Sequence, residues 1–196
     1  MKNIEIKARL AGLARARETA LRLGARPMGS LRQIDTFFPA HRGRLKLRQE
    51  STGSGDRAEL IFYERPDEAG PKASVFDLVP VADPELLRRV LTSALGVRLE
   101  VRKVRELWML DRTRIHLDTV EGLGPFLELE VAVDPGDDEG DRISLARRYL
   151  EEFGVRETDL VRSAYADLLE ASASAGGAED PTDANGAKRS TTSDAE

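Results

Sequence analysis

The stretch Asn3-Ile4-Glu5-Ile6-Lys7-Ala8-Arg9 decides the fold, because polar and apolar residues alternate through all of it. Successive residues of a β-strand point to opposite faces of a sheet, so this alternation predicts a strand with one apolar face. The other face carries only polar or charged groups, namely Asn3, Glu5, Lys7 and Arg9. Other segments of the chain repeat this pattern of a charged face behind an apolar one.

Seven further segments have the alternation or the composition of strands. Together with residues 3–10, we expect strands at residues 35–38, 42–49, 59–65, 72–80, 97–109, 113–120 and 126–133. Helical periodicity and end signals predict helices at residues 12–23, 85–95, 141–153 and 158–169. Residues 122–125, Gly-Leu-Gly-Pro, predict a hairpin turn between the last two strands. Many antiparallel strands with few helices indicate an α+β domain.

The polar faces of these strands carry charges of one sign at a time. Four cations are in phase in residues 42–48, and two carboxylates, Glu128 and Glu130, are in phase in the last strand. A sheet with one face in water would explain any single strand. A solvated face usually mixes both signs with neutral polar residues, which these segments do not. We therefore predict a barrel whose charged faces line a common lumen and whose apolar faces are covered by the helices.

A lumen of this composition suits a polyanion together with a divalent cation. Guanidinium groups bind phosphate oxygens in a bidentate manner. Carboxylates suit Mg²⁺, which completes its coordination shell with substrate phosphates and water. A complex of a triphosphate with a metal ion matches this set of side chains.

The composition of the 196-residue chain excludes several classes of protein. Its lack of cysteine and its two histidines, His41 and His116, exclude disulfide scaffolds, thiolate zinc sites and multi-histidine metal sites. No apolar run approaches the length of a membrane span, so we expect a cytoplasmic protein with no membrane partner. Residues 171–196 lack large apolar side chains and are predicted to be a disordered polar tail after a folded domain of residues 1–170.

The charged motifs, in this order, resemble the CYTH superfamily of triphosphate tunnel metalloenzymes. This superfamily groups class IV adenylyl cyclases, thiamine triphosphatases and inorganic triphosphatases. Residues 3–7 are similar to its opening Glu-x-Glu-x-Lys signature, and residues 163–169 are similar to its last helix. Five further segments resemble its successive tunnel strands: residues 35–38, 43–48, 103–105, 114–118 and 126–130. Among its branches, the chain looks most like the bacterial class IV adenylyl cyclase-like group.

The resemblance implies an eight-stranded antiparallel β tunnel with helices packed outside, which binds a triphosphate with Mg²⁺ or Mn²⁺. The metal-facing carboxylates it implies are Glu5, Glu128 and Glu130, with Asp118 nearby. The residues it implies for the substrate phosphates are Lys7, Lys46, Arg48, Arg65, Lys103, Arg105 and Arg114. The catalytic roles it implies fall on Glu5, Lys7 and Asp118.

The chain departs from the signature at Asn3, which stands where the family has its first glutamate. An amide adds no charge and cannot act as a base, so this departure puts the usual metal arrangement in question. The resemblance favours cyclisation of ATP to cyclic AMP and pyrophosphate. Hydrolysis of an inorganic or organic triphosphate, and non-catalytic binding of a triphosphate or polyphosphate, are the alternatives. We expect no nucleic-acid partner, because the domain is not net basic and has few aromatic residues. The sequence leaves a homodimer open.

Overall fold

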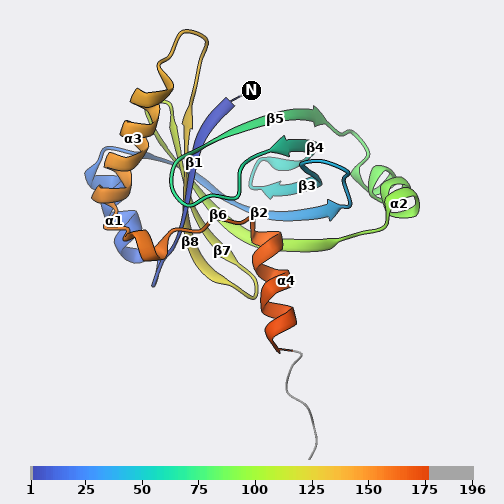
Figure 1. Cartoon of the computed structure of the whole chain (residues 1–196). Helices are drawn as coiled ribbons and strands as arrows, with labels where there is room; N and C mark the ends of the chain where they lie inside the picture. The colour runs from blue at the N-terminus through green and yellow to red at the C-terminus, as the bar shows by residue number, and fades with distance from the viewer. Residues whose placement is uncertain (1, 177–196) are drawn as a thin grey trace, which may run out of the picture.

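The alternating segments close into a barrel in the computed structural model, which describes residues 2–176. The strands are β1 (Lys2–Arg9), β2 (Arg26–Phe38), β3 (Arg44–Thr52), β4 (Gly55–Glu64), β5 (Lys72–Pro80), β6 (Leu99–Leu110), β7 (Thr113–Val120) and β8 (Gly124–Ala132). Around the barrel they follow the order β1-β5-β4-β3-β2-β6-β7-β8, and β8 pairs with β1 to close it (Figure 1). Every neighbouring pair is antiparallel, so the predicted eight-stranded antiparallel tunnel is confirmed.

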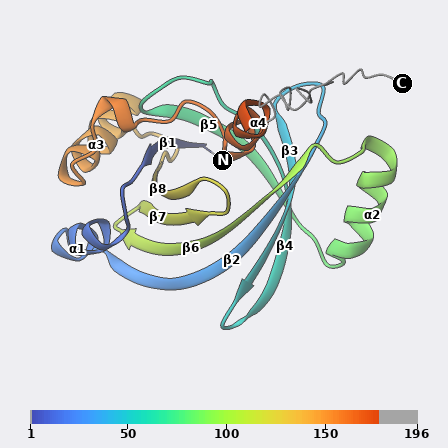
Figure 2. The same ribbon diagram turned by 90° about the horizontal axis from the view of Figure 1, so that it is seen from below.

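The helices lie on the outside of the barrel. They are α1 (Ala14–Arg22), α2 (Pro84–Leu95), α3 (Glu139–Glu152) and α4 (Tyr165–Gly176). Figure 2 shows α1 and α3 together on one side of the barrel and α2 on the opposite side. No helix within residues 2–176 is long and apolar enough to cross a membrane.

The main hydrophobic core lies between the outer face of the barrel and the helices α1 and α3. Ile6 of β1, Ile115 of β7 and Leu129 of β8 point into it and are at most 1% exposed. Ala20 of α1 and Leu150 of α3 cover them from outside. Burying an aliphatic side chain of this size contributes about 1.5–3 kcal/mol. The apolar strand faces thus point outward under helices, as predicted, and this leaves the charged faces to point inward.

Helix α4 begins later than the sequence predicts. A helix was expected from residue 158, but Glu157–Asp159 form a short 3-10 turn and Leu160 pairs with Ala8 of β1 in an isolated antiparallel bridge. The N–H of Val161 donates to the carbonyl of Lys7 at 2.8 Å, so pairing with β1 keeps this segment extended. This prediction was wrong because a hydrogen bond distant in sequence overrides local periodicity.

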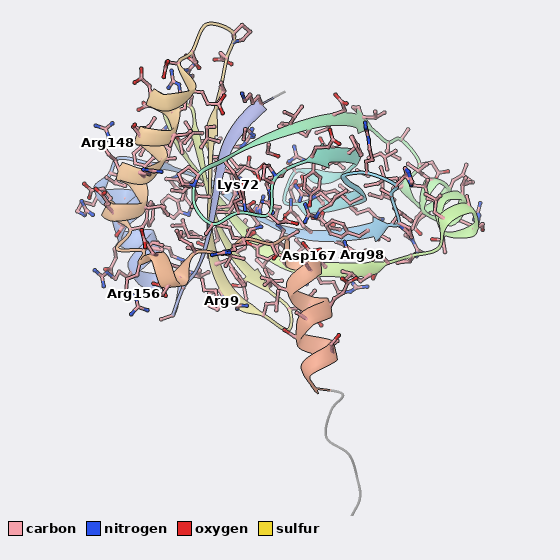
Figure 3. The ribbon with its side chains drawn as sticks, in the orientation of Figure 1. Arg9, Lys72, Arg98, Arg148, Arg156 and Asp167 are labelled. Atoms are coloured by element: carbon pink, nitrogen blue, oxygen red, sulfur yellow. The ribbon has the colours of Figure 1, made fainter. Side chains whose placement is uncertain are left out.

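The position of α4 is fixed by ion pairs to the barrel. Arg98, just before β6, donates to Asp167 of α4 at 2.8 Å, and Arg44 of β3 donates to the same carboxylate at 2.9 Å (Figure 3). The helix continues to Gly176 and so includes the first residues of the segment predicted to be a polar tail. The rest of that predicted tail, residues 177–196, lies outside the described residues.

Candidate active site

The inward faces of the strands enclose a cavity of about 370 Å³. Its lining contains eight basic side chains, namely Lys7, Lys46, Arg48, Arg57, Arg65, Lys103, Arg105 and Arg114. It also contains six carboxylates, namely Glu5, Asp35, Glu50, Glu59, Glu128 and Glu130. Every residue predicted for phosphate or metal binding is therefore in the lining, with the exception of Asp118.

One side of the lumen is basic and is built from β2, β3 and β6. We call Lys46, Arg48, Lys103 and Arg105 the basic wall. Asp35 of β2 lies opposite Arg48 in the strand register and accepts from it twice, at 2.7 Å in both bonds. The same carboxylate accepts from Lys46 at 2.9 Å. Burial opposes the charge of Asp35, but Arg48 and Lys46 hold its pKa well below the usual value. Asp35 therefore fixes two cations in place.

Asp118 plays the same part for the other half of the basic wall. Its carboxylate is fully buried and accepts from Arg105 at 2.7 and 2.6 Å and from Lys103 at 3.1 Å. The hydroxyl of Tyr165 also donates to it, at 3.0 Å. Burial opposes the charge of Asp118, yet Arg105 and Lys103 lower its pKa. Its oxygens are thus occupied by protein donors behind the surface of the cavity, which makes Asp118 a poor candidate for a metal ligand.

Both lysines of the basic wall have pKa values below that of a free lysine. Burial, reinforced by Arg105, lowers the pKa of Lys103 to about 7. Burial, reinforced by Arg48, lowers the pKa of Lys46 to about 8. An anion in the lumen would favour their charged forms. The basic wall is therefore suited to phosphate groups.

The opposite side of the lumen, on β1 and β8, contains Glu5, Glu128 and Glu130, which we call the carboxylate wall. The strand register sets Glu5 opposite Glu130, so that two acids face each other, and sets Lys7 opposite Glu128. Each carboxylate accepts from an arginine of the lumen: Glu5 from Arg65 at 3.0 Å, Glu128 from Arg105 at 2.8 Å and Glu130 from Arg114 at 2.8 Å.

Glu5 remains short of positive charge in spite of its arginine. Burial raises its pKa, and the neighbouring Glu130 and Glu128 raise it further, against the smaller opposing effect of Arg65. Within residues 2–176, no three His, Cys, Asp or Glu side chains are already assembled around an ion position. The carboxylate wall is thus a concentration of negative charge that its own arginines do not fully neutralise.

Asn3, which stands where the signature has its first glutamate, accepts a hydrogen bond from Arg114. With its amide oxygen turned toward Arg114, that oxygen accepts from the guanidinium at 2.9 Å and the amide nitrogen donates to the carbonyl of Lys2 at 3.0 Å. This orientation gives both amide atoms a hydrogen-bond partner. In the reverse orientation the amide oxygen would face an acceptor and the amide nitrogen a donor. Asn3 therefore positions Arg114, which in turn holds Glu130.

Sequence reasoning missed several residues of the site, Asp35 and Tyr165 among them. Asp35 stands in a quoted tunnel-strand motif, and its place opposite Arg48 becomes visible only when the pairing of β2 with β3 is known. Tyr165 was interpreted as part of a family helix, but its ring lies against the amino group of Lys7, with Nζ 3.8 Å from the ring centroid. No local signal distinguishes such a tyrosine from an ordinary core residue.

These features can be compared with known proteins. A model of the CYTH domain matches residues 1–165. The chain belongs to the CYTH family. Proteins of this family are triphosphate-processing enzymes, cyclases and triphosphatases among them, so the predicted resemblance is confirmed.

Individual relatives agree with this assignment. A curated protein of Methanocaldococcus jannaschii, named "Putative adenylate cyclase", is 27% identical over 92 residues, which are 46% of this chain and 52% of that protein. The chain therefore matches about half the length of this curated relative. A protein structure from Pyrococcus horikoshii superposes with a TM-score of 0.74 at 22% identity, covering 85% of this chain and 98% of that one.

A further solved structure comes from Hippeastrum and is described as a "putative adenylyl cyclase" that "reveals a dominant" triphosphatase activity. It superposes with a TM-score of 0.57 at 18% identity, covering 87% of this chain and 96% of that one. At this level of identity the two solved structures show a shared fold.

The family implies a divalent metal ion, and the chemistry of the carboxylate wall fits one. Its three glutamates supply hard oxygen donors, which Mg²⁺ and Mn²⁺ prefer. Burial, Glu130 and Glu128 raise the pKa of Glu5, and a divalent cation held by these three carboxylates would oppose that effect. Glu5, Glu128 and Glu130 are the described side chains that fit this ion.

Proposed function

We propose that this chain is a metal-dependent enzyme that converts ATP to cyclic AMP and pyrophosphate inside the tunnel, as class IV adenylyl cyclases do. One observation carries the choice of an organic triphosphate. Between the two charged walls, the lining of β4 and β5 includes an apolar patch, in which Ile61 pairs with Leu78 and Tyr63 pairs with Phe76. A bare inorganic triphosphate has no group to place there, whereas a nucleoside does.

In this proposal the basic wall positions the phosphates. Arg48 and Arg105 would bind phosphate oxygens, with Lys46 and Lys103 completing the contacts. Fixed donors of this kind stabilise the charge that develops on a departing phosphate group, at no cost of reorganisation. Asp35 and Asp118 act through these cations as positioning residues. The earlier expectation of a metal-binding and catalytic role for Asp118 is replaced by this one.

The carboxylate wall would supply the chemistry at the attacking oxygen. Glu5, Glu128 and Glu130 would hold Mg²⁺ or Mn²⁺, which when bound neutralises phosphate charge and makes a nucleophile more acidic. Lys7, within 3.5 Å of Glu128, would stabilise negative charge on the phosphates.

Triphosphate hydrolysis is the second candidate. It is favoured by the Hippeastrum neighbour, which is described with a dominant triphosphatase activity. In this reaction water replaces the ribose hydroxyl and the terminal phosphorus is attacked. The two walls would serve the same purposes in both reactions.

The test is a panel of substrates with either metal ion. ATP, inorganic triphosphate and thiamine triphosphate are each supplied with Mg²⁺ or Mn²⁺, while cyclic AMP, pyrophosphate and phosphate are measured. Cyclic AMP and pyrophosphate in equal amounts from ATP support the cyclase. Phosphate release without cyclic AMP supports hydrolysis instead. Tight metal-dependent triphosphate binding without turnover would replace both proposals by a non-catalytic binder.

A pair of variants tests the apolar lining. Ile61→Thr places a hydroxyl in the lumen and should raise the KM for ATP, while leaving the KM for inorganic triphosphate unchanged. Val79→Thr is the matched control, because Val79 lies on β5 with 57% of its surface exposed on the outside. Equal effects of Ile61→Thr on both substrates would contradict the placement of the nucleoside.

A further inference from the structure

His116 is a buried histidine in the lumen to which neither the sequence nor the proposed reaction gives a role. It belongs to β7, lies opposite Glu128 in the strand register, and is 4% exposed. Its Nδ1 is buried and has no hydrogen-bond partner. Buried polar atoms are paired in the great majority of cases, and an unpaired one costs about 1–3 kcal/mol. An unpaired nitrogen in the lining of an active site therefore indicates a missing partner.

The nearest acidic atom is too far away to be that partner. Nδ1 of His116 lies 3.7 Å from Oε1 of Glu130, which is longer than a hydrogen bond. A neutral imidazole with a proton on Nε2 has a free lone pair on Nδ1.

A lone pair held in this way is suited to a metal ion. Two ligand atoms of one ion, each about 2.1 Å from it, can be at most about 4.2 Å apart. The 3.7 Å between Nδ1 of His116 and Oε1 of Glu130 meets this condition. The oxygen of Asn3, by contrast, is already engaged by Arg114.

We propose that His116, through Nδ1, is a ligand of the divalent cation together with Glu130, and supplies the contact that the signature's first glutamate would make. This inference rests on the proposed metal-dependent function. A site with one nitrogen donor favours transition-metal ions over Mg²⁺, which prefers oxygen. We therefore expect the chain to select Mn²⁺ over Mg²⁺.

The test detects the nitrogen directly. The full chain, prepared without a histidine tag, is loaded with Mn²⁺ and inorganic tripolyphosphate, which contains no nitrogen of its own. Pulsed electron paramagnetic resonance should show coupling of the Mn²⁺ electron spin to an imidazole ¹⁴N. Incorporation of ¹⁵N-histidine should replace this ¹⁴N signal by a ¹⁵N signal, and this measurement requires no variant.

Variants assign the signal to one of the two histidines. His116→Gln should abolish it and weaken Mn²⁺ binding at least about 10- to 100-fold, the range found for less direct changes at metal sites. The affinity for Mg²⁺ should fall less than that for Mn²⁺, so the ratio of the two affinities should become smaller. His41→Gln is the matched control, because His41 is exposed between β2 and β3. It should retain the coupling and the affinity.

The outcomes separate this inference from the proposed function. Bound Mn²⁺ without imidazole coupling, in a protein that still turns over a triphosphate, overturns the role of His116 alone. Coupling that persists in His116→Gln overturns it as well. An absence of Mn²⁺ binding, with or without tripolyphosphate, overturns the metal-dependent function and this inference together.

Discussion

The two walls of the tunnel are both buried and charged, but Asp35 and Asp118 of the basic wall differ from Glu5 of the carboxylate wall in how their charge is balanced. On the basic wall, Asp35 and Asp118 each accept hydrogen bonds from two cations, and these cations lower both pKa values against the effect of burial. On the carboxylate wall, Glu5 has one arginine partner and two carboxylate neighbours, and its pKa is raised. The charges of Asp35 and Asp118 are balanced by cations of the protein, whereas that of Glu5 is not. Its neighbours Glu128 and Glu130 have lowered pKa values in spite of burial, because cations of the lumen lie beside them.

This difference separates carboxylates that stabilise the fold by pairing with buried cations from a carboxylate that is suited to bind a ligand. Breaking a completed buried pair leaves a stranded charge, and this costs stability. Removing the charge of Glu130 relieves its repulsion of Glu5 and leaves only Arg114 unpaired, which is 42% exposed, so the cost should appear in metal binding and turnover instead. Arg105 joins the two walls, because it donates to both Asp118 and Glu128.

The largest expected effect is that of Asp118→Asn on stability. This substitution leaves Lys103 without its buried counter-ion and Arg105 with Glu128 alone, and should lower the free energy of unfolding by about 3–5 kcal/mol. Urea unfolding measures the change. Asp77→Asn is the control, because Asp77 is exposed on β5, and it should shift stability by no more than about 0.5 kcal/mol. Equal stability of the two variants would show that Asp118 is not a structural counter-ion.

The second effect is on the carboxylate wall. Glu130→Gln removes a negative charge beside Glu5 and should reduce turnover of the triphosphate at least about 100-fold, because a metal-facing carboxylate is lost. Its free energy of unfolding should change much less than that of Asp118→Asn. Steady-state rates at saturating Mg²⁺ and Mn²⁺ check this. If Glu130→Gln kept its turnover but lost stability, Glu130 would be a structural counter-ion like Asp118 and not a metal ligand.

Much of this comparison could be predicted from the sequence, because the period of a strand is short and local. The inward phase of Glu5, Lys7 and Glu128 follows from alternation alone, and the structure places all three in the lining. The start of β2 could not be predicted in this way. Residues 26–34 precede the expected strand, and a register shift between Pro27 and Gly29 interrupts the alternation that would have revealed them.

The role of each residue in the site was harder to predict than its presence in the lining. The resemblance implies that Asp118 lies near the metal ion, and only the convergence of Lys103, Arg105 and Tyr165 on its oxygens shows that they are already hydrogen-bonded. These partners come from β6 and α4, distant in sequence. Asn3, in the same way, has a partner in Arg114 that no local pattern indicates.

The third effect concerns the basic wall as a phosphate site. Arg48→Ala removes a charge-assisted donor and should weaken triphosphate binding about 10- to 100-fold, since such a hydrogen bond contributes about 1.5–3 kcal/mol. Calorimetric titration with tripolyphosphate measures it. Arg102→Ala is the control, because Arg102 is exposed on the outside of β6, and it should bind like the unaltered chain. Unchanged binding in Arg48→Ala would argue that the phosphates lie elsewhere.

The smallest effect is a pH dependence that distinguishes the lysines of the basic wall from its arginines. In the free protein Lys103 has a pKa of about 7, lowered by burial and by Arg105, and bound phosphate favours its charged form. Affinity should therefore become level about one pH unit below the pKa of Lys103, where this lysine is already largely charged. Above pH 7 binding must take up a proton, so affinity should fall by up to about tenfold per pH unit.

Lys103→Arg provides the matched variant for this profile, since a guanidinium stays charged throughout the range. Its affinity for tripolyphosphate should stay level up to about pH 8, where Lys46, with a pKa of about 8, begins to lose its proton. Titrations between pH 7 and pH 9 compare the two proteins. An identical slope in both would assign the proton uptake to another group, and would leave the lysines as charged at neutral pH as the arginines beside them.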